Sequence, residues 1–274
     1  GNASVVNGIA GSITSYGYYA TGIRTQTYGD AEVSNAGAIV AGSMVYSALA
    51  WGIHSEASGE GATVAIDNTG DIQAAAIFGA TGIQAISSGV GGVATVSNSG
   101  DITVLQNRLM TSYGAYGILV SADGDSSINN SGDIFVASKG PAFGLAAMSF
   151  SGEASVTNTG NVTVSSTVNS TGVTPTGLLA FGANRTAAVD NSGTVVATGV
   201  RRAAGIDASA YGDVSIDNSG DVSAYATGMV TNTRADGVKA VSGSGTITLD
   251  NSGSISASGT TVGLGVYAVA ENGN

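Results

Sequence analysis

The chain has 274 residues, a net charge of −11 and no cysteine, so disulfide bridges and thiolate metal sites are excluded. Its 8 basic residues against 19 acidic ones cannot neutralise many phosphates, which makes nucleic acid and anionic membrane surfaces poor partners. Hydrophobic residues supply 43% of the chain, so it has more apolar content than a disordered linker. No apolar run reaches the length of about 18 residues that crosses a bilayer, and we expect no direct membrane insertion.

The first recurring element along the chain is a glycine followed by a large aliphatic residue. Its copies begin at Gly22, Gly52, Gly82, Gly117, Gly144, Gly177, Gly205, Gly237 and Gly265. Each of the first eight copies is followed by an alternating stretch such as Val214-Ser215-Ile216-Asp217. A period of two residues predicts β-strands whose side chains alternate between the core and solvent. Helix is disfavoured, because glycine, serine, threonine, valine and asparagine are poor helix formers.

The second recurring element is Asn-x-Gly-x-(Ile/Val), which closes each alternating stretch. Its asparagines are Asn35, Asn68, Asn98, Asn130, Asn158, Asn191, Asn218 and Asn251. Successive asparagines are separated by roughly 27–33 residues, and a period in this range indicates stacked supersecondary units rather than an ordinary globular domain.

Three short strands separated by glycines in each unit predict a three-faced coil that stacks on the next coil. We therefore expect an all-β right-handed parallel β-helix of about nine coils, each of roughly 27–33 residues, forming a single domain over residues 1–274. Aliphatic residues at matching positions should line the core in three columns, which begin with Ile23, Val33 and Ile39. Burying each such side chain stabilises the fold by roughly 1.5–3 kcal/mol.

The eight asparagines should stack at one corner of the helix. Their amides can then hydrogen-bond along the axis, as asparagine ladders do in cross-β stacks. We expect the glycine two residues later to adopt a positive φ and so turn the corner. The alternative, in which these asparagines bind a substrate, is less economical.

A second regularity underlies the first. The separation between asparagines two coils apart is nearly constant, so the complete repeat is a two-coil unit of about 60 residues. Every second coil carries an insertion, covering roughly residues 41–51, 104–116, 164–176 and 224–236. These insertions are rich in apolar residues and supply a candidate partner-binding ridge. Its members are Met44, Tyr46, Trp51, Leu109, Met110, Tyr113, Tyr225 and Met229.

Two interpretations of the insertions stay open. They either fold back and bury their apolar side chains on the flank of the rod, or they expose them as a ridge that binds a partner or another rod. Exposed apolar patches of this size mark interaction sites.

Nothing in the sequence assembles a catalytic constellation, and we expect neither an enzyme nor a cofactor. The single histidine, His54, should point outward as a solvated residue. Two aspartate columns recur, and we expect ordinary turn aspartates rather than a metal site. The first consists of Asp71, Asp101 and Asp133, and the second, the candidate for a cation ladder, of Asp190, Asp217 and Asp250. Polysaccharide-active β-helix enzymes need clustered acids with a basic residue, and here the basic residues are scattered.

The combined repeat resembles the passenger repeats of bacterial autotransporter-type surface adhesins. It is carried by Gly205-Ile206-Asp207-Ala208 and by the stretch from Gly212 through Asn218-Ser219-Gly220-Asp221-Val222. The resemblance implies a non-enzymatic stalk or adhesin at the bacterial cell surface. Its partners would be a cell-surface glycan or protein ligand, or copies of itself. The family's membrane barrel and signal peptide are not recognised here, so we expect an excised segment.

The sequence shows no polar capping element at either end of the repeat array. We expect either an uncapped segment of a longer array or a subunit that stacks end to end into an extracellular filament. A polysaccharide-active enzyme is the third and least favoured hypothesis.

Overall fold

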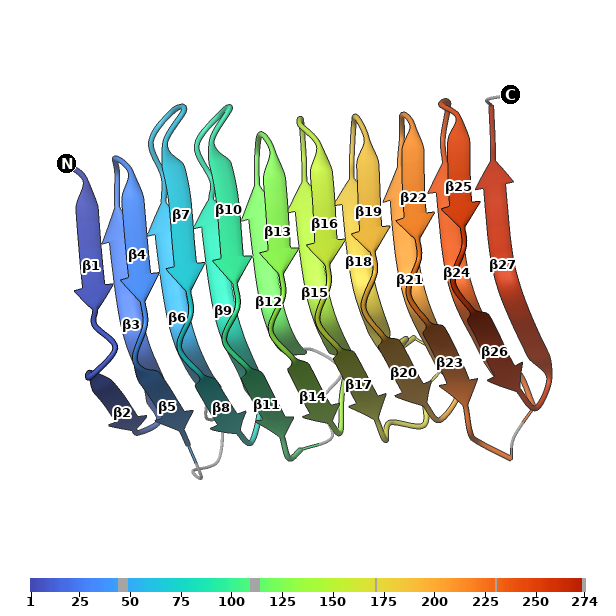
Figure 1. The fold of residues 1–274 in the computed structure, drawn as a ribbon, viewed down its shortest axis with the longest axis horizontal. Helices are drawn as coiled ribbons and strands as arrows, with labels where there is room; N and C mark the ends of the chain where they lie inside the picture. Colours follow the sequence, from blue (N-terminus) through green and yellow to red (C-terminus); the bar gives the residue numbers. More distant parts are fainter. Residues whose placement is uncertain (44–48, 109–113, 171, 230, 273–274) are drawn as a thin grey trace.

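The protein is described here by a computed structural model, which covers residues 1–43, 49–108, 114–170, 172–229 and 231–272. The described residues form three nine-stranded sheets, and all neighbouring strands are parallel. Successive strands along the chain visit the three sheets in turn, so that each set of three strands makes one coil of a β-solenoid (Figure 1). This confirms the predicted parallel β-helix fold.

Three sheets, here sheets A, B and C, form the walls of the rod. Sheet A consists of β1 (Ala3–Asn7), β4 (Ala31–Asn35), β7 (Thr63–Asn68), β10 (Val93–Asn98), β13 (Ser126–Asn130), β16 (Ala154–Asn158), β19 (Ala187–Asn191), β22 (Val214–Asn218) and β25 (Ile247–Asn251). Sheet B consists of β2 (Ser12–Tyr16), β5 (Ala38–Gly42), β8 (Ile72–Ala76), β11 (Ile102–Gln106), β14 (Ile134–Ser138), β17 (Val162–Ser166), β20 (Val195–Gly199), β23 (Val222–Ala226) and β26 (Ile255–Gly259). Sheet C consists of β3 (Tyr19–Thr27), β6 (Leu49–Ala57), β9 (Gly79–Ser87), β12 (Ala115–Ala122), β15 (Ala142–Ser149), β18 (Thr176–Gly182), β21 (Arg202–Ala210), β24 (Arg234–Ser242) and β27 (Val262–Ala270).

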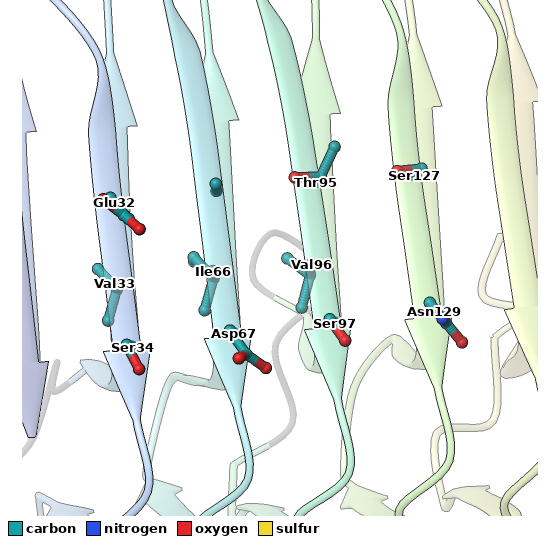
Figure 2. A pocket seen from close by; sticks show the side chains of 11 residues that line it. Glu32, Val33, Ser34, Ile66, Asp67, Thr95, Val96, Ser97, Ser127 and Asn129 are labelled. Carbon is teal, nitrogen blue, oxygen red and sulfur yellow. The ribbon is translucent and has the colours of Figure 1, made fainter. Parts of the chain in front are cut away.

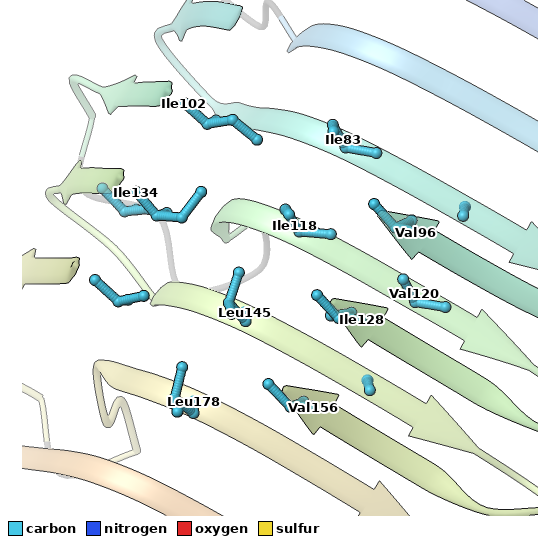
Figure 3. Close-up of a cluster of buried hydrophobic side chains, with 14 of the residues drawn as sticks. Ile83, Val96, Ile102, Ile118, Val120, Ile128, Ile134, Leu145, Val156 and Leu178 are labelled. Atoms are coloured by element: carbon cyan, nitrogen blue, oxygen red, sulfur yellow. The ribbon is translucent and has the colours of Figure 1, made fainter. Parts of the chain in front are cut away.

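The core is a narrow column of aliphatic side chains between the three sheets (Figure 3). Ile83, Ile118 and Leu145 are fully buried on neighbouring strands of sheet C. The predicted columns on sheets A and B face them, represented by Ile128 and Ile134. At the two ends of the rod the same columns are only partly buried, because one side has no neighbouring coil among the described residues.

The glycines of the Asn-x-Gly motif occupy the corner between sheets A and B. The prediction that they adopt positive φ is wrong, because among the described glycines only Gly61 and Gly91 do so. Glycine is required there for a different reason. A Cβ at Gly100 would overlap the carbonyl oxygen of Gly70, and a Cβ at Gly132 would overlap that of Gly100. The corner backbones therefore approach one another too closely for any side chain.

Sheet C is interrupted by a second column of glycines, each inside a strand. The register skips Gly52, since Trp51 pairs with Thr81 and Ile53 pairs with Ile83. A Cβ on Gly52 would point inward and overlap the side chain of Ile72. Two successive residues thus face the core, the alternation shifts by one, and the strand bends, as glycine inside a strand permits. The long strands of sheet C curve accordingly, as β27 shows in Figure 1.

The predicted two-coil period lies in the connections from sheet B to sheet C. Long connections follow β5, β11, β17 and β23, whereas short ones follow β2, β8, β14, β20 and β26. All four long connections leave the same corner of the rod. The part of the chain that is described has no helix at all, and so none long and apolar enough to cross a membrane.

Candidate binding groove

The bend at the sheet C glycines brings two outer columns of side chains toward each other and forms a groove along the rod. The first column, immediately before each glycine, contains Thr21, Trp51, Thr81, Tyr116, Phe143, Thr176, Ala204, Asp236 and Leu264. The second, two residues after each glycine, contains Arg24, His54, Gln84, Leu119, Ala146, Leu179, Asp207, Lys239 and Tyr267. From the N-terminal to the C-terminal end of the rod, the side chains that line the groove are first polar and aromatic, then apolar, and finally charged.

Two hollows share Trp51 as a common wall. The first has a volume of about 230 Å³ and is lined by Thr21, Arg24, Trp51, His54 and Glu56. The second, of about 290 Å³, extends on the other side of Trp51 across Thr81 to Tyr116. Threonine alternates with an aromatic residue along this stretch of the first column, so a space remains on each side of the Trp51 indole.

The far wall of the second hollow is an aromatic stack. The rings of Tyr116 and Phe143 lie 4.9 Å apart with an interplanar angle of 8°. Burial in this stack raises the pKa of the Tyr116 phenol. Leu119, also lining the hollow, is only 9% exposed although it lies on the outer face of the sheet. The stack therefore forms a partly buried aromatic wall.

A chain of hydrogen bonds runs along the rim of the first hollow. Arg24 donates to Gln26, and Gln26 donates to Glu56 at 3.1 Å. Glu56 lies 2.8 Å from Nε2 of His54, and Nδ1 of His54 lies 2.8 Å from Oε1 of Gln84. Because an ionised carboxylate only accepts hydrogen bonds, Glu56 is the acceptor in its contact with His54.

His54 is more enclosed than its outward position suggested. Its side chain is only 12% exposed, and its ring meets Trp51 edge to face with centroids 5.5 Å apart. The prediction of a solvated surface histidine is therefore wrong. Alternation placed the residue on the correct face of the strand, but the groove and the indole beside it shield the ring from water.

The C-terminal part of the groove holds paired charges around a hollow of about 220 Å³. Nε of Arg234 donates to both carboxylate oxygens of Asp236, at 3.0 and 2.8 Å, and its guanidinium lies 4.5 Å from the Tyr267 ring centroid. The hydrogen bond to Asp236 raises the pKa of Arg234. Lys239 pairs with Asp207 at 2.9 Å. These partners neutralise most of the charge within this hollow.

A wider hollow of about 400 Å³ lies on the outer face of sheet A, across β4, β7, β10 and β13 (Figure 2). The outward side chains are small or polar: Glu32, Ser34, Ala65, Asp67, Thr95, Ser97, Ser127 and Asn129. No aromatic ring lines it. A flat, solvated face of this kind offers a ligand little apolar contact area, so the sheet C groove is the stronger candidate.

The predicted asparagine column lies at the sheet A–B corner and runs the length of the rod. Each Nδ2 donates to Oδ1 of the asparagine in the following coil, at 2.6 to 2.9 Å. The same Nδ2 also donates to the carbonyl of the glycine two residues on, as Asn130 does to Gly132 at 2.7 Å. Asn7 adds a further member, because it donates to Asn35 at 2.7 Å. These amides satisfy one another and face no hollow described above.

The first aspartate column is explained by backbone hydrogen bonding. Oδ1 of Asp71 accepts from the Asp101 backbone N–H at 3.1 Å, and Oδ1 of Asp101 accepts from that of Asp133 at 3.0 Å. In the second column Asp190, Asp217 and Asp250 lie in register on the outer face of sheet A. Within the described ranges, no three His, Cys, Asp or Glu residues gather closely enough to hold a metal ion.

The candidate ridge residues are distributed over different surroundings. Trp51 lies in the groove, Tyr225 is 37% exposed on the outer face of β23, and Met229 is 98% exposed in the last long connection. In the third long connection, Val168 and Val173 are buried. Met44, Tyr46, Leu109, Met110 and Tyr113 lie outside the described residues. The third connection therefore buries two of its valines, as the first interpretation expects, whereas the fourth exposes Met229, as the second expects.

Sequence reasoning missed Tyr116, Phe143 and the hydrogen-bonded rim as parts of one groove. The signal was present, because Trp51, Tyr116 and Phe143 each come immediately before a glycine of the Gly-aliphatic motif. Aligning the repeats on that glycine places all three in one outer column.

Comparison of the chain with protein-family models, curated proteins and solved structures finds no match. The fold and the groove therefore rest on the geometry of the chain itself.

Proposed function

We propose that this protein is a non-enzymatic structural and adhesive rod of a bacterial cell surface, acting as a stalk or adhesin. The observation that supports this role is the continuous hydrogen bonding between coils. Three parallel sheets and the asparagine ladder connect every coil to the next one. A cell-surface location and a glycan or protein ligand follow from the resemblance of the repeats to autotransporter passengers.

Such a rod suits a stalk because its stiffness does not depend on a wide core. Each coil contributes about 4.8 Å, so nine coils extend on the order of 40 Å. A side wall made of repeated columns can present a binding surface away from the membrane. The outer face of sheet C is the part of this wall where hollows and aromatic side chains occur together.

Surface display tests this role. The chain would be fused to an unrelated outer-membrane anchor in a non-adherent bacterium, with the anchor alone as the matched control. We expect the displayed rod to resist protease and to increase attachment to glycan-coated or protein-coated surfaces. Attachment no greater than that of the anchor alone, with the rod shown by antibody to be displayed, would refute the adhesive role.

A second candidate function, the subunit of an end-to-end filament, is favoured by the polarity of the asparagine ladder. Every Nδ2 donates toward the C-terminal coil, so Oδ1 of Asn7 faces no preceding asparagine and Asn251 has no following one in this chain. The aliphatic residues Val5 and Leu249 are likewise only partly covered at the two ends. The end faces are therefore complementary to each other, and a second copy could continue the ladder and all three sheets.

Electron microscopy of the purified chain tests this filament. Stacked rods should show an axial repeat of about 40 Å, since nine coils add about 4.8 Å each. Leu249→Lys should abolish stacking by placing a charge in the end face. The matched control, Asn129→Lys, puts the same charge on the exposed outer face of sheet A and should leave stacking intact. Only separate short rods at all concentrations would argue against the filament.

A further inference from the structure

We infer that the N-terminal half of the sheet C groove is a binding site for a neutral glycan chain, with Trp51 between two adjacent sugar subsites. This inference rests on the proposed adhesive role only in naming the ligand a surface glycan. The site itself consists of the two hollows on either side of Trp51, closed on one side by the Tyr116–Phe143 stack.

The aromatic rings supply the apolar part of glycan recognition. Sugar rings carry C–H groups on one or both faces, and these stack on the flat, electron-rich faces of tryptophan and tyrosine. Trp51 and Tyr116 are both half-buried and line the second hollow from opposite sides. Trp51 on β6 and Tyr116 on β12 are two strand spacings apart, about 9–10 Å. The strand between them carries the small residue Thr81 at the matching position, which keeps this space open. The spacing leaves room for a ring to enter between them.

The polar rim supplies the hydroxyl partners. Glu56 contributes acceptors, Arg24 contributes donors, and the amides of Gln26 and Gln84 contribute both. Hydroxyl groups of a sugar donate and accept in the same way, so this mixed set fits a polyol. The hydrogen bonds from Arg24 through Gln26, Glu56 and His54 to Gln84 link these side chains in one network. The His54 side chain at its centre is only 12% exposed, and a polar partner that is already held in place reduces the entropy that binding must overcome.

The size and charge of the site argue for a neutral chain rather than a single charged ligand. Each hollow is smaller than the roughly 300–1,000 Å³ of a site for a drug-sized ligand, so each suits one small ring. The two hollows lie side by side along the rod and open on the same face of sheet C. Arg24 is matched by Glu56, and the protein carries a net charge of −11, which disfavours polyanionic chains.

Trp51 is the only tryptophan of the chain, so intrinsic fluorescence reports directly on this site. The probes are four neutral hexasaccharides: cellohexaose, maltohexaose, xylohexaose and chitohexaose. We expect at least one of them to change the emission saturably at millimolar concentrations or below. Titration calorimetry then provides the dissociation constant for variants that lack the indole.

Two variants test the placement of the ligand. Trp51→Ala removes the shared wall and Thr81→Phe fills the second hollow; each should weaken binding by about tenfold or more, as loss of an aromatic anchor does. Trp51→Phe should retain most of the affinity. Tyr211→Ala removes an exposed aromatic ring outside the groove and should leave the affinity unchanged. Thermal melting followed by circular dichroism verifies that each variant is folded.

Two results would overturn the inference: no saturable binding of any of the four hexasaccharides, or binding that persists unchanged in folded Trp51→Ala and Thr81→Phe. The adhesive role fails separately. Saccharide binding without attachment of displaying cells would support the groove and refute the adhesin. Attachment to protein-coated surfaces, with none of the four saccharides bound, would refute the glycan site and leave the adhesin standing.

Discussion

Nδ2 of Asn130 donates to Oδ1 of Asn158 at 2.9 Å, in the middle of a ladder that connects all nine coils. The same amide accepts from Asn98 and donates to the carbonyl of Gly132. Both asparagines are fully buried. The ladder thus saturates a row of polar groups that would otherwise be buried without partners inside the rod.

The first prediction concerns the loss of one step of this ladder. Asn130→Ala removes the partner of three buried hydrogen-bonding groups: one N–H of the Asn98 amide, which keeps its other bond to the Gly100 carbonyl, Oδ1 of Asn158, and the Gly132 carbonyl. We expect the free energy of unfolding to fall by about 3 kcal/mol or more, since each orphaned group costs about 1–3 kcal/mol. Urea denaturation followed by circular dichroism measures the change.

The adjacent residue is the matched control. Asn129 has the same chemistry but points outward and is exposed. Asn129→Ala should change stability by no more than about 0.5 kcal/mol. Equal effects of the two substitutions would show that the ladder does not stabilise the rod.

The ladder shows what repeat spacing can predict and where it fails. Eight asparagines share one sequence context, so their column follows from the spacing alone. Asn7 was missed because two additional residues separate it from its corner glycine, Gly11. A tight turn absorbs them, in which the Gly11 N–H donates to the Gly8 carbonyl at 2.7 Å. Only the folded structure, in which Asn7 pairs with Asn35 at the corner between sheets A and B, shows that the two residues occupy equivalent positions.

The groove was harder to predict because it depends on curvature. Alternation from the buried Ile53 places His54 on the outer face of the strand, but in an ideal strand the same alternation would place Trp51, three residues earlier, on the opposite face. The bulge at Gly52 brings both side chains onto the outer face. The recurring glycine of the Gly-aliphatic motif indicates an irregular backbone at that position. The sequence alone does not distinguish a turn between strands from a bend within a strand that forms a groove.

The corner glycines provide the second prediction. Because a Cβ at Gly100 would overlap the carbonyl oxygen of Gly70, Gly100→Ala must push two coils apart. We expect a loss of about 3 kcal/mol, the upper part of the usual range for overpacking, measured by urea denaturation. Gly17→Ala is the control, because the nearest atom to its Cβ would be the Tyr19 carbonyl oxygen at 3.8 Å. A tolerated Gly100→Ala would contradict the close approach of the coils.

The third prediction is a stabilising substitution. Ser126 is fully buried in a core column between Ala94 and Ala154, and its hydroxyl has no hydrogen-bond partner among the described residues. Ser126→Ala should raise the free energy of unfolding by about 1 kcal/mol, because burying an unpaired hydroxyl costs at least that much. Ser127→Ala on the outer face is the control and should have little effect. A clear destabilisation by Ser126→Ala would show that the hydroxyl is satisfied.

The fourth prediction concerns acid stability at the junction between the second and third coils. Oδ1 of Asp30 accepts a hydrogen bond from the Thr63 backbone N–H at 2.9 Å and one from the Thr63 hydroxyl at 3.1 Å. The backbone hydrogen bond is the main cause that lowers the pKa of Asp30 from its ordinary value of 3.8. A lowered pKa in the folded state means that the carboxylate stabilises the fold above pH 3.8, and that this contribution is lost as the pH falls through the folded-state pKa.

Asp30→Asn keeps an acceptor oxygen for Thr63 but cannot be protonated in this range. We therefore expect the variant to have a lower Tm than the natural chain near neutral pH, where the carboxylate is the stronger acceptor. The difference in Tm should narrow as the pH falls below 3.8. Asp67→Asn, on the outer face of β7, provides the control for a change of surface charge. Calorimetric melting of the three chains across acidic pH measures this. A difference in Tm that does not vary with pH would show that the Asp30 carboxylate does not couple the second and third coils.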